Sequence, residues 1–158
     1  MNRNNIFLFV LAIAAGYFVF SGLNHAEPEG SSSTVWMTDF EAAKAKAKAE
    51  NKSMLLDFTG SDWCGWCIQL DREVFSKEAF LEYADAKLVL VELDFPHAKE
   101  QSAELKAQNR ALAEQYGIRG YPTIVLLSAD GELIEKTGYR RGGPEKYIEH
   151  LEDLLAAN

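Results

Sequence analysis

The stretch SDWCGWCIQL, from Ser61 to Leu70, contains both cysteines of the 158-residue chain and two of its three tryptophans. Cys64 and Cys67 are separated by two residues. The apolar run SMLLDFTG ends just before this stretch and predicts a buried strand, so Cys64 falls in a strand-to-helix turn and Cys67 one turn into the helix. Two thiols in this setting can form a redox couple, half of a metal site or a structural disulfide.

The predicted position of Cys64 favours redox chemistry. At the start of a helix, unpaired backbone N–H groups and the helix dipole stabilise a thiolate, so we expect Cys64 to be the attacking thiol. Cys67 follows three residues later on the same helical face. It is therefore placed to close a small disulfide ring and to resolve a mixed disulfide formed at Cys64.

The other interpretations of the cysteine pair have less support. Zinc takes a tetrahedral ligand set, and beyond the two cysteines the chain offers only three histidines in distant segments, His25, His97 and His150, so no metal site is expected. A structural disulfide gains stability with loop length, and this loop is very short. Two further alternatives stay open: transfer of Cu(I) between the thiolates, and a non-enzymatic binding or assembly module.

The N-terminal segment predicts export. Residues 1–26 contain the apolar run IFLFVLAIAAGYFVF, with Arg3 as the only charged side chain before it. This length fits either a signal peptide or a membrane anchor; the anchor is favoured because the candidate cleavage site, residues 24–26, begins with Asn where a small residue is wanted. The position of Arg3 predicts that the rest of the chain lies outside the cytoplasm. Residues 27–35 predict a flexible tether, and residues 36–158 a single domain.

The charge of the chain limits its partners. The formal net charge is −8, from 24 acidic and 16 basic side chains. Such an acidic surface argues against nucleic acid or anionic lipid as a partner.

Apolar periodicity and capping signals predict the order helix, strand, helix, strand, helix, strand, strand, helix. We expect Thr38 to cap the first helix and Ser76 to cap the second part of the second helix. This order predicts an α/β fold with a central mixed sheet flanked by helices and a hairpin at one side. The predicted helices cover residues 38–51, 67–84, 98–117 and 143–155, and the predicted strands cover residues 53–60, 87–95, 123–127 and 132–139.

Two motifs carry a resemblance to a known family. DFTGSDWCGWC, residues 57–67, and YGIRGYPTIVLL, residues 116–127, resemble the thioredoxin family, whose members carry W-C-x-x-C after the first central strand and a cis-proline before a later one. The likeness covers residues 36–155 and is closest to exported or membrane-tethered thioredoxin-like proteins and to the thioredoxin domains of thiol:disulfide interchange proteins. It implies a thioredoxin-like fold and a thiol:disulfide oxidoreductase activity.

The resemblance also implies roles for individual residues. Cys64 matches the nucleophile, Cys67 the resolving thiol with which it forms the redox disulfide, and Pro122 the cis-proline. The backbone of Tyr121 would pair with an extended substrate. Asp57 resembles the buried acid that exchanges a proton with Cys67, and we expect burial to raise its pKa.

The chain departs from thioredoxin proper at two places. Six residues separate Asp57 from Cys64, where thioredoxin proper has five, and Asp71 is a second candidate acid. Trp66 replaces a proline. Because Gly65 and Trp66 provide no positive charge beside the thiol, a reducing or intermediate potential is favoured.

The aromatic residues around the cysteines predict a substrate-binding surface. We expect Trp63, Gly65, Trp66, Tyr121 and Pro122 to contact the substrate; alternatively, both indoles simply pack on the domain. The expected substrates are disulfides in polypeptides. A reductase in an oxidising compartment needs electrons, so a membrane electron-donor protein is the expected second partner, with no small cofactor.

Overall fold

The computed structural model describes residues 36–157, so the predicted export segment and tether lie outside the described residues. The described residues form helices and strands in the predicted order, which confirms the α/β class. None of the helices within residues 36–157 is long and apolar enough to span a membrane. The helices are α1 (Phe40–Glu50), α2 (Gly65–Leu70), the π-helical turn η1 (Asp71–Phe75), α3 (Glu78–Lys87), α4 (Ala103–Gln115) and α5 (Gly143–Ala156). The strands are β1 (Ser53–Thr59), β2 (Leu88–Asp94), β3 (Thr123–Leu127) and β4 (Leu133–Thr137).

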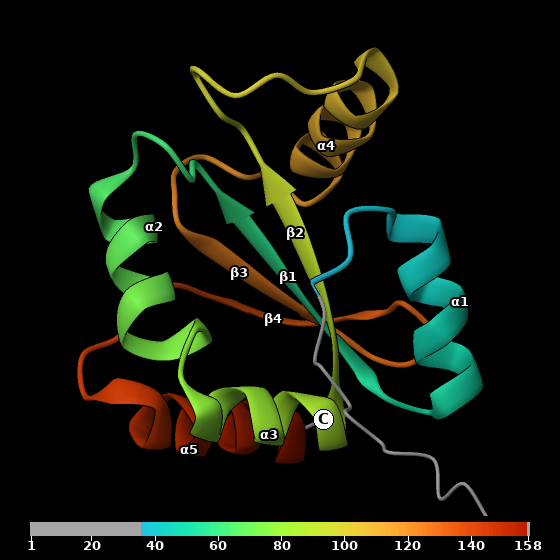
Figure 1. The fold of residues 1–158 in the computed structure, drawn as a ribbon. Helices are drawn as coiled ribbons and strands as arrows, with labels where there is room; N and C mark the ends of the chain where they lie inside the picture. Colours follow the sequence, from blue (N-terminus) through green and yellow to red (C-terminus); the bar gives the residue numbers. More distant parts are fainter. Residues whose placement is uncertain (1–35, 158) are drawn as a thin grey trace, which may run out of the picture. The chain divides into compact units, whose positions relative to one another are not determined.

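The four strands of the described part form one mixed sheet in the order β2-β1-β3-β4 (Figure 1). β1 and β2 are parallel, and β3 is antiparallel to both β1 and β4. The parallel pair needs a crossover, which α2, η1 and α3 supply. The mixed sheet and the β3–β4 hairpin are therefore as predicted.

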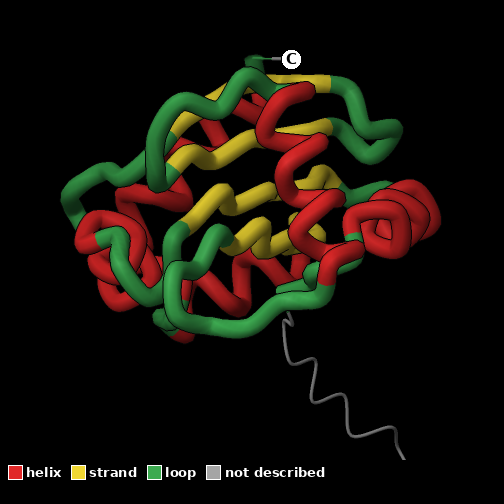
Figure 2. Tube along the Cα trace, turned by 90° about the horizontal axis from the view of Figure 1, so that it is seen from above, coloured by secondary structure: helices red, strands yellow, loops and turns green. Residues whose placement is uncertain are grey.

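Side chains alternate between the two faces of each strand, and this alternation divides the core into two layers on either side of the sheet (Figure 2). One face of β1, with Met54, Leu56 and Phe58, packs against α1 and α4. The opposite face, with Leu55, packs against α2, η1, α3 and α5. Asp57 follows Leu55 at a spacing of two, so it belongs to the face that α2 covers.

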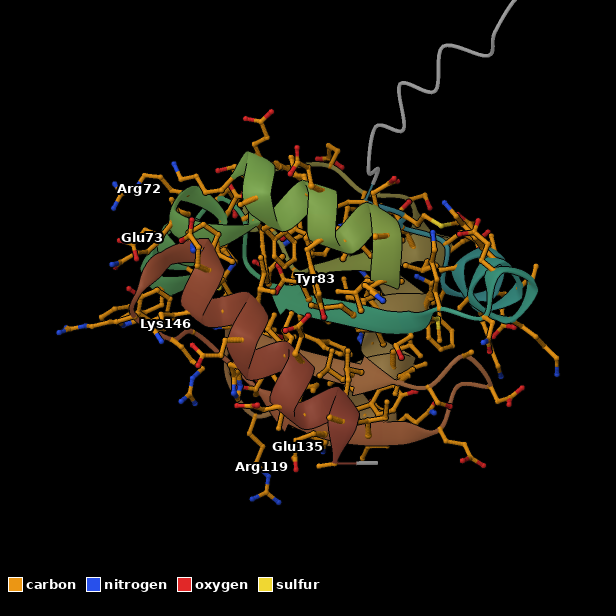
Figure 3. All side chains as sticks on the ribbon, turned by 90° about the horizontal axis from the view of Figure 1, so that it is seen from below. Arg72, Glu73, Tyr83, Arg119, Glu135 and Lys146 are labelled. Carbon is orange, nitrogen blue, oxygen red and sulfur yellow. A yellow bond between two sulfur atoms is a disulfide. The ribbon has the colours of Figure 1, made fainter. Side chains whose placement is uncertain are left out.

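Helices α3 and α5 cover this second face together (Figure 3). Tyr83 of α3 lies between the two helices in this view. Burial, and then the charge of Glu152 on α5, raises the pKa of the Tyr83 phenol to about 12. The phenol therefore stays neutral at physiological pH.

The start of α1 differs from the prediction by one residue. The cap is Asp39, not Thr38: its carboxylate accepts a hydrogen bond from the Ala42 N–H at 3.0 Å. The Gln108 side chain of α4 explains the shift, since it accepts from the Phe40 N–H at 3.0 Å and donates to the Thr38 carbonyl at 2.8 Å. A contact from a distant helix thus sets where α1 begins.

The prediction that Ser76 caps a helix is also wrong. The Ser76 N–H donates to the Asp71 carbonyl at 2.9 Å, five residues back, and so closes the π-helical turn. Its hydroxyl contacts the Arg72 carbonyl instead of an N–H group. Helix α3 begins after Lys77, which makes no side-chain cap.

The helix predicted for residues 98–117 begins later than expected. α4 starts at Ala103, and Ser102 caps it by accepting from the Leu105 N–H at 3.1 Å. Its C-terminal end is as predicted, because Gly117 adopts a positive φ of 60° just after the helix.

Replacing Asp39 with Ala is expected to lower the free energy of unfolding by about 1 kcal/mol, because the first turn of α1 loses its side-chain acceptor. Thr38→Ala is the matched control, since Gln108 contacts only the Thr38 backbone. Urea denaturation measures both. A larger loss for Thr38→Ala than for Asp39→Ala would contradict the observed cap.

Candidate active site

Cys64 is the N-cap residue of α2. After β1, a turn closed by the Cys64 N–H and the Gly60 carbonyl (2.8 Å) leads into the helix. The Cys67 N–H donates to the Cys64 Sγ at 3.2 Å, so the sulfur accepts from one of the N–H groups that a helix start leaves without a backbone partner. α2 continues directly into η1, so helical backbone runs on to Phe75. The two cysteines form a disulfide.

Large apolar side chains surround this disulfide. Cys64 and Cys67 are 6% and 4% exposed, whereas Trp63, Trp66 and Ile68 are 41%, 53% and 47% exposed. Exposed apolar side chains gathered around a covered reactive group are typical of a binding surface.

Trp63 is held in an aromatic cluster, which we call the Trp63 cluster: Trp63, Phe95, His97 and Tyr121. The Trp63 indole N–H donates to the Phe95 carbonyl at 2.8 Å. The indole stacks on His97 with ring centres 4.5 Å apart, and Tyr121 meets it edge-on at 5.8 Å. A Cβ on residue 60 would lie 2.5 Å from the Trp63 indole, so only glycine at this position leaves room for the ring.

The Tyr121–Pro122 peptide bond is cis. It lies immediately before β3, whose first residue, Thr123, pairs with Phe58 near the end of β1. Because the same end of β1 leads to Cys64, the Tyr121 backbone and the cysteines lie at one end of the sheet.

Trp66 lies against a different partner from Trp63. Its ring contacts Tyr139 with centres 5.3 Å apart. The Tyr139 hydroxyl donates to Glu73 at 2.7 Å and accepts from Gln69 at 3.0 Å, which anchors the phenol. Gly65, between the cysteines, has open space where a Cβ would be. Both indoles are therefore partly packed on the domain and partly exposed, and their contact with a substrate stays a prediction.

Asp57 is a buried carboxyl that shares a cavity with Cys67. Its side chain is 8% exposed, and its Oδ1 has no hydrogen-bond partner among the described residues. Asp57, Cys67 and Asp71 line one cavity of about 310 Å³. Burial raises the pKa of Asp57 well above its ordinary value, and the nearby carboxylates raise it further.

Glu92 is the nearest of these carboxylates in the sheet. It pairs with Asp57 across the parallel strands β1 and β2, and it lines the same cavity. Burial is the main cause that raises the pKa of Glu92. The charge of Asp94 raises this pKa further, and the Lys99 ammonium lowers it. Two acids of raised pKa thus line the same cavity as Cys67.

Another acid, Asp62, fixes the loop that follows β2. Its carboxylate accepts from the backbone N–H groups of His97, Ala98 and Lys99 at 2.7–3.2 Å. These hydrogen bonds lower the pKa of Asp62, and the bond from His97 has the largest effect. They hold the three residues in a loop, which explains why α4 begins later than predicted and why His97 stacks on Trp63.

Sequence reasoning missed Glu92 and Asp62. Glu92 stands in an apolar strand, KLVLVELDF, and its charge there was a usable signal. Asp62 lies in the turn that contains the extra residue between Asp57 and Cys64, and its partners are backbone groups about 35 residues away, which no local pattern reveals. Within residues 36–157, no three His, Cys, Asp or Glu side chains are grouped to hold a metal ion.

The sequence matches the thioredoxin-like domain family over residues 40–155. The chain belongs to this family. It is 32% identical over 133 residues to "Disulfide bond reductase DsbH" of Chlamydia pneumoniae, which covers 84% of this chain and 80% of that protein. It is 33% identical over 116 residues to "Thioredoxin-related protein DsbJ" of the same organism, but these span only 33% of that protein.

A solved structure supports the same assignment. The structure named "DsbH Oxidoreductase" superimposes with a TM-score of 0.75 at 30% identity, over 86% of this chain and 94% of that one. The thioredoxin-like fold implied by the two sequence motifs is therefore confirmed.

Asp57→Asn is expected to change how stability depends on pH. Since the pKa of Asp57 is raised in the folded state, the folded protein keeps a proton that the unfolded chain releases above about pH 4. Wild-type stability should therefore fall, by about 1.4 kcal/mol per pH unit, between that pH and the raised pKa. The variant lacks this contribution and should be more stable than wild type at neutral pH.

Urea denaturation at a series of pH values measures this difference. Asp130→Asn is the control, because that carboxylate is 73% exposed in a surface ion pair with Lys48. Parallel stability curves for wild type and Asp57→Asn would show that Asp57 ionises normally.

Proposed function

We propose that the chain is a thiol:disulfide oxidoreductase that reduces or exchanges disulfides in polypeptides outside the cytoplasm. The observation that carries the proposal is the Cys64–Cys67 disulfide at the start of α2, with the Cys64 Sγ accepting from a helix N–H group. The identity with a protein named as a disulfide bond reductase supports the same chemistry.

The first step is nucleophilic attack by reduced Cys64. Its thiolate attacks one sulfur of the substrate disulfide, forms a mixed disulfide and releases the other substrate sulfur as a thiolate, which takes up a proton. The helix start stabilises the attacking thiolate through its N–H groups. Cys64 is thus the nucleophile of the proposed reaction.

The second step regenerates the observed disulfide. Cys67 loses its proton and attacks the Cys64 Sγ, and the substrate leaves as a thiolate. Two electrons have then passed from the dithiol to the substrate. Asp57 shares a cavity with Cys67 and has a raised pKa, so its carboxylate is suited to accept the Cys67 proton, with Glu92 beside it.

The substrate binds along the exposed aromatic side chains. Tyr121 precedes β3 at the end of the sheet where β1 leads to Cys64, and an extended peptide can pair with its backbone there as an added strand. The exposed indoles of Trp63 and Trp66 offer apolar contacts to this peptide. Polypeptides fit this open surface better than small disulfides.

The proposed direction is reduction. Gly65 and Trp66, between the cysteines, carry no positive charge to stabilise the thiolate strongly, which favours a reducing or intermediate potential. The apolar run in residues 1–26, preceded by Arg3, supports a location outside the cytoplasm, with the segment acting as an anchor or a cleaved signal. Electrons would then come from a membrane protein.

Replacing Cys64 with Ser is expected to abolish the reduction of insulin by dithiothreitol that the wild type catalyses, because no nucleophile remains. Cys67→Ser should instead accumulate a mixed disulfide with the substrate, because the second step is blocked. Non-reducing electrophoresis and mass spectrometry detect the adduct. Turnover by Cys64→Ser would refute the proposed nucleophile, and binding without turnover by wild type would favour a non-enzymatic module.

A further inference from the structure

A second cavity lies beside the Trp63 cluster. It has a volume of about 380 Å³. Trp63, Phe95 and Tyr121 form one wall, and the first half of α4 forms the other. In Figure 1, α4 lies at the end of the sheet where β1 and β2 terminate. Because Trp63 and Tyr121 line this cavity and also belong to the proposed substrate surface, a group bound here lies next to a substrate held at Tyr121.

The wall from α4 presents two cations, Lys106 and Arg110. They are four residues apart, so both side chains lie on one face of the helix, where like charges repel each other. The ion pairs of residues 36–157 involve neither side chain. Asp94 also lines the cavity, but its carboxylate accepts from the Ser61 N–H at 2.9 Å and from the Ser61 hydroxyl at 2.6 Å, and it forms no ion pair with either cation. In a chain with a net charge of −8, two cations that no described carboxylate pairs with, beside the active site, favour an anionic ligand.

The neutral polar side chains of this wall already have partners. Asn109 is 1% exposed and donates to the Asp94 carbonyl at 2.9 Å, and Gln101 donates to the same carbonyl at 3.2 Å. Gln108, outside the cavity lining, also holds the helix to Thr38. These bonds fix α4 in place and leave Lys106 and Arg110 as the basic side chains of α4 available to a ligand.

We propose that this cavity binds an acidic side chain of the polypeptide substrate, close in sequence to the substrate cysteine. The carboxylate lies between Lys106 and Arg110, and its methylene groups pack on the aromatic wall. This inference rests on the proposed function and adds a substrate preference to it. The aromatic wall supplies apolar contact, and the two cations supply the discrimination between acidic and neutral substrates.

The test uses disulfide-bonded peptides that carry Glu, Gln or Lys at positions flanking the cysteine. The full-length wild type should reduce the Glu peptide with a kcat/KM about fivefold higher than the Gln peptide, the effect of one partly exposed ion pair. In the Lys106→Gln/Arg110→Gln variant this preference should disappear. The Lys77→Gln/Lys87→Gln variant removes the same charge from the two ends of α3, at its N-cap and its last residue, on the other face of the sheet, and should keep the preference.

A binding measurement separates this inference from the proposed function. Dye-labelled peptides with Ser in place of Cys cannot react, and fluorescence anisotropy should show tighter binding of the Glu peptide to wild type than to the Lys106→Gln/Arg110→Gln variant. If no peptide is reduced but the Glu preference in binding persists, the proposed function fails and the acidic-ligand site stands. Equal binding and equal reduction of Glu and Gln peptides overturn the site alone. The inference is also overturned if wild type reduces glutathione disulfide faster than any peptide and the Lys106→Gln/Arg110→Gln variant loses this activity. The cavity would then bind a small anionic disulfide.

Discussion

The reactive sulfur of this protein depends on the N-terminal end of α2. The Cys64 Sγ takes the place that a serine or aspartate oxygen usually takes at a helix N-cap, and it accepts from the Cys67 N–H. The rest of the site depends on this position. β1 delivers the turn that ends at Cys64, and Cys67 follows one turn later. Gly60 leaves room for the Trp63 indole over the turn, and the loop before β3 brings Tyr121 to the same end of the sheet.

The site combines two environments that are costly to build. Below the cysteines, Asp57 is buried with an unpartnered oxygen and another acid, Glu92, beside it in the sheet. Such a carboxyl lowers stability wherever the unfolded chain has released its proton, and in the proposed reaction it accepts the proton of Cys67. At the surface around the cysteines, the exposed indoles of Trp63 and Trp66 lower solubility but offer contact area to a polypeptide. Both features are better explained by reactivity than by folding.

Much of the fold could be predicted because its signals are local. Apolar runs identified every strand of the described sheet, and the strand-to-helix turn before Cys64 followed from the sequence around it. The predictions that were wrong concern features that depend on contacts between residues far apart in the sequence. Gln108 moves the start of α1 to Asp39, and Asp62 holds the residues after His97 out of α4. Pairing of Asp57 with Glu92 likewise required the register of β1 and β2.

The central claim is that the start of α2 stabilises the thiolate of reduced Cys64. The most direct measurement is the rate at which iodoacetamide alkylates reduced Cys64 as a function of pH, with Cys67 replaced by Ser so that a single thiol reacts. The account predicts a midpoint clearly below about pH 8.5, the value for a free cysteine. A midpoint at or above that pH, or a Cys64 that no alkylating reagent reaches, would contradict it.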